Sequence, residues 1–473
     1  MSVESQTLPG PSRPEDVPTA LSGESANPSW AWAPYEPSPQ RPWGLRWAGH
    51  LHRRAAFGAT WDQLHQAVAD GPQRSVERLL RPDADVDAFN HTYNEYEASA
   101  TDSDSADTLR AWWLRRITHT PHPLLEKMTL FWHNYFAISN VKVKSPLLMH
   151  QYTRLLRHHA LGCYEPLLEA VSHDPAMLVG LGSDENRKAR PNENYARELF
   201  QTFGLGLGHF SETDVREAAR AFTGWFVLRN NLRYIPREHD DGVKKVLDEE
   251  GNFNDSDIVR IILRQPAAHR LLVRRLYRWL ISETEEPPDA LIGPLAESFG
   301  EDYDVSKLVG TMLRSNLFFS AAAYRRRIKS PVEFALAIIQ GLEGSVSTTE
   351  LGQDLAALGQ NLYHPPTVQG WPGGLHWINN ATLLGRSNLA LALLAGSGPY
   401  GNKLAPLAIA ERHSHSSPEA AREFVLDLFL QGDLEGNVRE ALLKTAPEAG
   451  GGPSQWLRQF THQVVSLPEF QLA

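Results

Sequence analysis

The sequence predicts an all-α protein: a multi-helix, bundle-like body with one small β-hairpin inserted near residues 225–247. Two observations lead to this prediction. Many segments combine a helical repeat of apolar residues with a recognisable helix start, and only short breaks separate them. One stretch, from Trp225 to Pro236, instead has two β-prone runs around an asparagine pair, which is typical of a short hairpin.

The helical segments differ in how much of their surface is apolar. The segment 105–117 carries its large apolar residues at helical spacing on one side. The segment 122–137 is apolar around most of its circumference, as expected of a central buried helix. Three further helices begin with an N-cap residue followed by a proline or a carboxylate. These pairs are Ser145 with Pro146, Ser211 with Asp214, and Ser330 with Glu333.

The chain is predicted to hold one domain behind a leader. Residues 1–43 are rich in Pro, Ser and Glu and lack a hydrophobic period, so they are expected to form a disordered leader. Residues 44–473 are expected to form one large helical domain, because the linkers at 99–106, 414–419 and 446–454 are short. The aromatic residues of the leader either pin its end onto the body, which we favour, or form a partner motif. They are Trp30, Trp32, Tyr35 and Trp43.

Composition excludes several classes of protein. The 473 residues are 42% apolar and 22% charged, as in soluble globular proteins. A net charge of −10 argues against a nucleic-acid binder that neutralises phosphates. The single cysteine, Cys163, excludes a disulfide framework and a cysteine zinc site within one chain. There is no apolar run long enough to span a membrane and no secretory signal, so a cytoplasmic protein is expected.

A polar αα-hairpin is predicted around residues 192–221. One helix carries a polar stripe at helical spacing, made of Asn194, Arg197, Glu198 and Gln201. It ends in a glycine-rich loop of about seven residues, and the next helix begins at Ser211. In an antiparallel pair, Glu198 and Glu217 would face each other, with Arg197 and Arg220 close by. Such a group is either an acid–base site or a structural ion-pair network, and both interpretations stay open.

Two histidine positions add candidate chemistry. His133 lies in an otherwise aromatic helix, where it is either a satisfied core histidine or a functional one. His239 and Asp240 follow the predicted hairpin and would suit metal ligation or a base with its orienting carboxylate. The irregular stretch 361–380 contains Trp371, which either contacts a ligand or caps the helical core. The run 243–247 is a candidate third strand.

Several segments, taken in order, identify a family: residues 50–60, 127–137, 192–225, 239–247, 327–334 and 370–377. The sequence resembles the bacterial family called domain of unknown function 1800 over roughly residues 45–471. The resemblance implies a large, mostly helical protein without an established reaction. It also implies that many members are exported and are encoded beside a family of predicted exported proteins, a candidate partner. This chain departs from the commoner family form at Tyr135, where that form has a second histidine.

From the residues and the resemblance together, we hypothesise that the polar motif positions line one cleft. The first hypothesis is an enzyme, a hydrolase or lyase acting on a polar polymer or conjugate. The alternative is a helical scaffold that docks a partner protein and uses the same residues as a structural core. A divalent metal held by a histidine is the cofactor that these residues suggest. The candidate catalytic residues are Glu198, Glu217, His133, His239 and Asp240, and the candidate substrate-binding residues are Arg197, Arg220, Asn194, Asn134 and Trp371.

Overall fold

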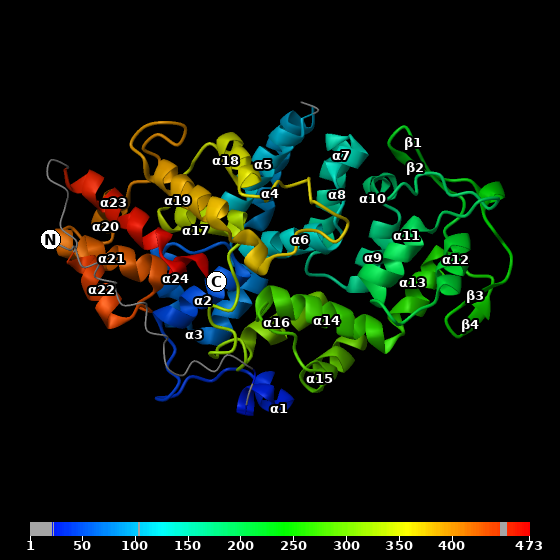
Figure 1. Ribbon diagram of the computed structural model, residues 1–473, viewed down its shortest axis with the longest axis horizontal. Coiled ribbons are helices and arrows are strands. Elements are labelled where there is room, and N and C mark those ends of the chain that lie inside the picture. The colour runs from blue at the N-terminus through cyan, green and yellow to red at the C-terminus, as the bar shows by residue number, and fades with distance from the viewer. Residues whose placement is uncertain (1–20, 22, 103–104, 445–451) are drawn as a thin grey trace, which may run out of the picture.

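The protein is mainly α-helical, as predicted. A computed structural model describes residue 21 and residues 23–102, 105–444 and 452–473. Within these ranges the chain forms 24 α-helices and two separate two-stranded antiparallel sheets. The body is elongated, with the C-terminal helices α19–α24 at one end and helices α9–α13 with both sheets at the other (Figure 1). None of these described helices combines the length and the apolar character needed to cross a bilayer.

The first sheet divides the α-helices into two groups along the chain. The α-helices before the first sheet are α1 (Pro28–Ala31), α2 (Leu45–Ala55), α3 (Trp61–Leu80), α4 (Val86–Asp102), α5 (Ala106–His119), α6 (Pro123–Tyr135), α7 (Asn140–Val143), α8 (Pro146–His159), α9 (Tyr164–Ser172), α10 (Pro175–Gly180), α11 (Glu193–Glu198) and α12 (Glu212–Ala221). Those after it are α13 (Asp255–Leu263), α14 (Pro266–Leu280), α15 (Asp289–Gly300), α16 (Val305–Arg314), α17 (Pro331–Gly341), α18 (Thr348–Ala357), α19 (Asn380–Leu394), α20 (Pro406–Arg412), α21 (Pro418–Leu430), α22 (Gly436–Leu443), α23 (Pro453–Ser466) and α24 (Pro468–Gln471). The strands are β1 (Trp225–Leu228), β2 (Asn231–Tyr234), β3 (Lys244–Val246) and β4 (Glu249–Gly251). Short 3₁₀ helices span Gly23–Ala26, Pro236–Glu238 and Gly374–Trp377, and a π-helix spans Leu199–Gly204.

The predicted helix starts are confirmed. Ser145 accepts the N–H of Leu148 at the start of α8. Ser211 and Asp214 form a reciprocal capping box at α12. Ser330 forms the same arrangement at α17 with the third residue of that helix. These polar side chains satisfy backbone N–H groups that the helix itself leaves without a partner. The helices therefore begin where local sequence dictates.

The β-hairpin prediction is confirmed in place and corrected in detail. Strands β1 and β2 pair antiparallel, but the two turn residues with positive φ are Arg229 and Asn230, so Asn231 already belongs to β2. The run 243–247 does not add a third strand to this sheet, because β3 pairs with β4 instead. The physical reason is that α12 holds this segment through backbone N–H groups. The N–H of Lys245 donates to Glu217 (3.2 Å).

The described part of the expected leader is ordered rather than disordered, since its aromatic residues pin it to the body. The indole of Trp32 donates to the carbonyl of Leu291 (2.8 Å), and that of Trp43 donates to the carbonyl of Ala67 (3.0 Å). Tyr35 is fully buried. Residues 1–20 and 22 lie outside the described residues. The three expected linkers have different outcomes in the structure. The segment 414–419 joins α20 to α21, whereas residues 99–102 belong to α4. Most of the segment 446–454 lies outside the described residues.

A cluster of buried charges joins three parts of the chain. Lys127 of α6 pairs with Glu333 of α17, and Arg327 also donates to Glu333 (3.2 Å). Lys127 further donates to the carbonyl of Ala56, just after α2 (2.9 Å). Burial alone would raise the pKa of Glu333, but Arg327 and Lys127 outweigh it and hold the pKa well below its usual range. The carboxylate therefore stays ionised inside the protein, and its partners stay fixed around it.

Replacing this carboxylate should destabilise the fold strongly. We expect Glu333→Gln to lower the free energy of unfolding by about 3–5 kcal/mol, because it leaves Lys127 and Arg327 buried without their counter-charge. Chemical denaturation measures the change. The control is Glu440→Gln, which breaks only the exposed pair with Lys444 and should cost less than about 1 kcal/mol. Equal effects of the two substitutions would contradict the importance of the cluster.

Candidate functional site

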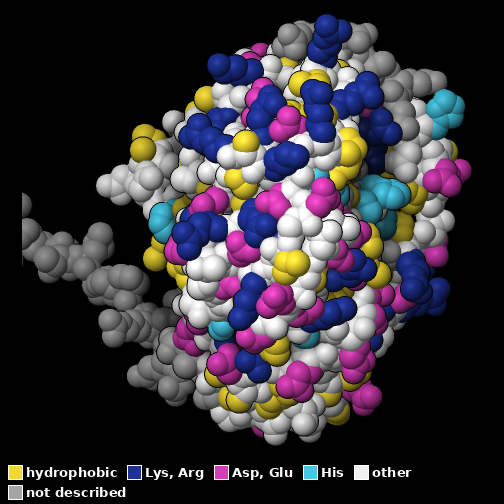
Figure 2. All heavy atoms as spheres, turned by 90° about the vertical axis from the view of Figure 1, so that its right-hand side faces the viewer, with side chains coloured by type: hydrophobic (Ala, Val, Ile, Leu, Met, Phe, Trp, Pro, Cys, Tyr) yellow, Lys and Arg dark blue, Asp and Glu magenta, His cyan; other side chains and the backbone are white. Residues whose placement is uncertain are grey.

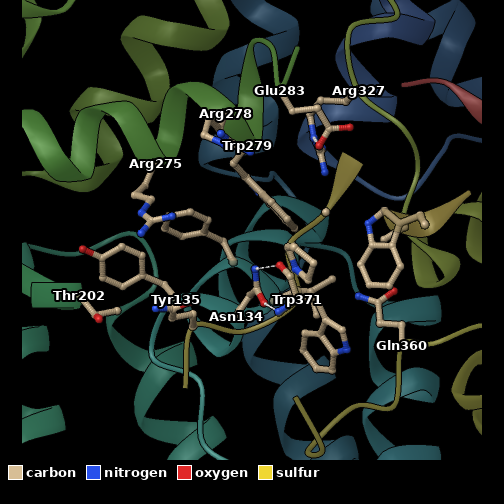
Figure 3. Close-up of a pocket in the computed structure, with 17 residues that line it drawn as sticks. Asn134, Tyr135, Thr202, Arg275, Arg278, Trp279, Glu283, Arg327, Gln360 and Trp371 are labelled. Atoms are coloured by element: carbon tan, nitrogen blue, oxygen red, sulfur yellow. Dashed lines mark hydrogen bonds and ion pairs between the residues drawn. The ribbon is translucent and has the colours of Figure 1, made fainter. Parts of the chain in front are cut away.

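A pocket of about 140 Å³ opens between α6, α14 and the segment 360–377 (Figure 3). Its lining combines aromatic rings with cationic and amide side chains from elements far apart in the sequence. The lining residues are Leu130, Phe131, Asn134, Tyr135, Thr202, Arg275, Arg278, Trp279, Glu283, Arg327, Ser330, Gln360, Gln369, Trp371, Pro372, Gly373 and Trp377.

Adjacent residues of α6 hold one wall of the pocket in place. The backbone N–H of Tyr363 donates to Nε2 of His133 (3.2 Å). The N–H of Trp371 donates to Oδ1 of Asn134 (2.6 Å), and Nδ2 of Asn134 donates back to the carbonyl of Trp371 (3.3 Å). Figure 3 shows Asn134 and Trp371 facing each other across this contact. His133 and Asn134 of α6 thus clamp the irregular segment 360–377 onto this helix.

Glycine is required where this segment crosses α6. Gly370 has a φ of +76°, a conformation that other residues adopt only with strain. A Cβ at Gly370 would lie 2.2 Å from Oδ1 of Asn134 and 2.3 Å from its carbonyl oxygen. Only glycine allows the backbone to approach this closely. The glycine-rich stretch after residue 369 therefore serves the clamp.

The environment of His133 is apolar and keeps its ring neutral. The ring is fully buried and packs against Trp113, Tyr363 and Trp371, with centroids 5.2 to 5.8 Å away. Burial lowers its pKa to about 3, so the ring is neutral at neutral pH. Its Nε2 accepts a backbone N–H, which places the proton on Nδ1, an atom without a partner among the described residues.

The charged residues that line the pocket are three arginines and one glutamate. Arg275 is exposed at its rim and makes no hydrogen bond or ion pair with the described residues. In Figure 3 its guanidinium points over Tyr135. The guanidinium of Arg327 stacks on Trp279, 4.6 Å from the ring centroid. Nε of Arg327 and Nε1 of Trp279 are buried and have no hydrogen-bond partner in the described part of the chain, although Nε of Arg327 lies 3.9 Å from a carboxylate oxygen of Glu283. Glu283 is the carboxylate among the lining residues, and it already accepts the N–H of Ile328 (2.5 Å).

A π-helix supplies another part of the wall. In the span Leu199–Gly204 the wider turn brings Thr202 to the pocket, and its hydroxyl donates to Glu198 (2.6 Å). The carbonyl of Phe203 accepts the hydroxyls of Tyr135 (3.0 Å) and Tyr164 (2.7 Å). Tyr135 of the aromatic helix thus anchors the π-helix. Glu198 lies behind this wall and is not among the lining residues.

The predicted αα-hairpin is present, but its carboxylates have separate partners. Helices α11 and α12 are joined through Arg197, which binds Glu212 (2.8 Å) and Glu193 (3.0 Å) rather than Glu198. Glu217 accepts from Arg220 (2.7 Å). The structure therefore does not give Glu198 and Glu217 the shared partners that an acid–base pair in one cleft requires.

The predicted residues after the first β-hairpin are also satisfied locally. Arg220 donates twice to Asp240 (2.8 and 3.0 Å), and this bond lowers the pKa of Asp240 to about 2. Nδ1 of His239 contacts the carbonyl of Thr223 (2.8 Å). Asn194 donates to the carbonyl of Leu181 at the end of α10 (2.9 Å). Of the ten residues proposed from the sequence, Asn134 and Trp371 alone line the pocket. Within the described ranges, no three His, Cys, Asp or Glu side chains are grouped as a metal site requires.

Comparison with known proteins gives a family and no further neighbour. The family model described as "Protein of unknown function (DUF1800)" matches residues 50–472. The chain belongs to this family. No curated protein and no solved structure matches it. Three of the segments that carry the family pattern, 127–137, 327–334 and 370–377, converge on the pocket through Asn134, Arg327 and Trp371.

The remaining lining residues had little signal in the sequence. Arg327 lies in a family segment, three residues before the predicted helix start at Ser330, and nothing in that segment marks it as a pocket residue. Arg275 and Trp279 belong to an amphipathic helix rich in arginine, where each looks like an ordinary surface residue. Glu283 follows that helix in an acidic loop. Only the packing of α14 beside α6 shows that these side chains meet.

The clamp predicts an unequal response to two glycine substitutions. Gly370→Ala should lower the free energy of unfolding by about 2–5 kcal/mol, because the new methyl group adds a clash with Asn134 to the backbone strain. Gly359→Ala is the matched control: φ is +95° there, and nothing lies within 4 Å of its Cβ position, so strain alone should cost about 1–2 kcal/mol. Denaturant unfolding compares the two. A smaller loss at Gly370 than at Gly359 would rule out the clamp.

Because His133 is neutral in the folded protein, we expect its contribution to the free energy of unfolding to depend on pH. Its pKa is about 3 in the folded protein, below the value of about 6.5 in the unfolded chain. Its contribution to stability is therefore complete above about pH 6.5 and is lost as the pH falls. We expect the stability advantage of wild type over His133→Gln to shrink by about 2 kcal/mol between pH 7 and pH 5. Taking the difference in free energy of unfolding between wild type and His133→Gln cancels the effects of the other titrating groups. If this difference stays constant between pH 7 and pH 5, His133 is not a buried, neutral histidine.

Proposed function

We propose that this protein binds an anionic ligand in the pocket between α6, α14 and the segment 360–377. The observation that carries the proposal is the unpaired guanidinium of Arg275 at the rim of that space. Arg275 makes no hydrogen bond or ion pair with the described residues, whereas Arg327 is paired with Glu333 and Glu283. An exposed arginine without a counter-charge can bind an anionic group of a ligand through charge-assisted hydrogen bonds.

The aromatic walls support a ligand with a ring or a flat face. Trp279, Trp371 and Trp377 line the pocket together with Phe131 and Tyr135. Aromatic faces bind the apolar faces of rings, while arginine and amide groups bind their charged and polar substituents. A volume of about 140 Å³ resembles that of engineered cavities, about 150 Å³, that accept a benzene ring. One acidic ring unit, either free or at the end of a polymer or conjugate, fits these features.

An enzymatic form of the proposal is a hydrolase or lyase acting on such an acidic polymer or conjugate. Glu283 supports it as the carboxylate at the pocket that could transfer a proton, since its side chain is 11% exposed and faces Arg327. Arg275 would hold the anionic group of the substrate. Glu198, Glu217, His133, His239 and Asp240 have no part in this version, because they do not line the pocket.

The alternative of a helical scaffold that docks a partner protein rests on a different observation. The polar cluster of α11, α12 and the turn after β2 is mutually satisfied: Arg220 binds Asp240 and Glu217, and Arg197 binds Glu193 and Glu212. Such a network holds helices together without a ligand. This supports a structural role for the cluster, and it leaves the pocket as the place where binding is proposed.

Anion binding is tested by one substitution at the rim. We expect isothermal titration with glucuronate and with inorganic phosphate to show binding, and we expect none with glucose. Arg275→Gln should weaken the binding roughly tenfold to a hundredfold, since a charge-assisted hydrogen bond contributes about 1.5–3 kcal/mol. Arg275 has no partner among the described residues, so the variant should fold normally.

Arg270→Gln is the matched control. Arg270 is an exposed arginine of the same helix, and it does not line the pocket. The Arg270→Gln variant should bind glucuronate and phosphate with the affinity of the wild type. Absence of binding by the wild type, or equal affinity of wild type and Arg275→Gln, would refute the proposed function.

A further inference from the structure

Lysine and arginine side chains gather on one edge of the molecule. Figure 2 views the end of the molecule that carries helices α9–α13 and both sheets. Dark blue side chains crowd the upper part of this view, whereas basic and acidic side chains are mixed below. The segments 140–144, 184–190 and 225–238 lie there. They hold three carboxylates and eight cations, an excess of five positive charges in a chain whose net charge is −10. The cations are Lys142, Lys144, Arg187, Lys188, Arg190, Arg229, Arg233 and Arg237.

The three segments form one surface, which we call the basic edge. The N–H of Val227 donates to the carbonyl of Asp184 (2.9 Å), and the N–H of Lys188 donates to the carbonyl of Glu238 (2.9 Å). The guanidinium of Arg187 lies over the ring of Phe226 (4.9 Å). Helix α10 contacts both α7 and β1. Figure 1 shows α7 and the β1–β2 hairpin at the same upper margin of the molecule.

Most of these cations are free to bind a partner. Of the eight, only Arg187 forms ion pairs within the described part of the chain, with Glu185 (3.3 Å) and Glu238 (3.6 Å). The arginines elsewhere on this half of the molecule are mostly paired, as Arg197 and Arg220 are. Folding therefore leaves seven of the eight cations of the basic edge without a counter-charge.

Exposed apolar side chains project among these cations. Val141 of α7 is 67% exposed, and Leu228 at the tip of the β1–β2 hairpin is 47% exposed. Leu147 and Tyr234 are also exposed. Apolar side chains that project from a ring of Lys and Arg suit the interface of a lipid bilayer, where the cations bind head groups and the apolar groups enter between them.

We propose that the basic edge docks the protein on a membrane surface rich in anionic lipid. This inference is independent of the pocket and does not rest on the proposed ligand. The shape of the edge favours a flat partner over a polymer chain. The hairpin and α7 project at a margin (Figure 1), and no cation of the edge lines the pocket between α6, α14 and the segment 360–377 or the cavities beside α2, α3 and α19 in the described residues. Nucleic acids and acidic polysaccharides are usually held in grooves.

Co-sedimentation with lipid vesicles tests the proposal on the full chain. We expect binding to vesicles of phosphatidylglycerol mixed with phosphatidylcholine, no binding to phosphatidylcholine alone, and weakening as salt rises. The double variant Arg190→Gln/Arg233→Gln should bind roughly thirtyfold more weakly, the factor that two surface cations contribute. Val141→Ser/Leu228→Ser should remove the part of the binding that persists at high salt.

Arg270→Gln/Lys403→Gln is the matched control. It removes the same charge from exposed positions outside the basic edge and should bind vesicles as the wild type does. Failure of the wild type to distinguish the two kinds of vesicle would overturn the proposal, and so would equal losses in both double variants. If heparin or single-stranded DNA binds more tightly than the vesicles do and displaces the protein from them, the partner is a soluble polyanion and the membrane proposal is wrong.

Discussion

The buried ion cluster of Lys127, Glu333 and Arg327 is the constraint on which the rest of the structure depends. Three charges inside a protein are tolerated only when each has its partners in place, so the cluster fixes α6 against α17 and the end of α2. Fixing α6 sets the direction of His133 and Asn134, which lie further along the same helix and hold the segment 360–377. The same cluster places the guanidinium of Arg327 on Trp279. One buried carboxylate thereby positions both walls of the pocket.

The polar residues of the family segments divide into two groups with different tasks. Asn134 and His133 accept backbone N–H groups from a segment more than 200 residues away and so build the pocket wall. Arg197 and Arg220 bind carboxylates close to them in sequence and so hold α11, α12 and the β3 segment together. A polar residue in a helical motif is therefore no direct sign of catalysis. Its role depends on whether its partners close a cavity or only join two elements.

Features set by local sequence could be predicted, and features set by distant packing could not. The caps at Ser211 and Ser330 follow from residues within one helical turn, as does the pairing of α11 with α12 across a short loop. The pocket instead needs Arg275 of α14 to meet Asn134 of α6, which no spacing in the chain reveals. The expected third strand fails for a similar reason: the carboxylate of Glu217, on another element, binds the N–H of Lys245 and directs β3 away from β2. The expectation of a pinned leader succeeded because buried aromatic side chains dominate packing wherever they occur.

Anion binding in the pocket is tested most directly by a crystal structure of the protein with selenate, whose selenium gives an anomalous signal. The unpaired guanidinium of Arg275 predicts an anomalous peak inside the pocket, within hydrogen-bond reach of that guanidinium, and its loss in Arg275→Gln crystals. Selenate ordered on other parts of the protein with none in the pocket would contradict anion binding there.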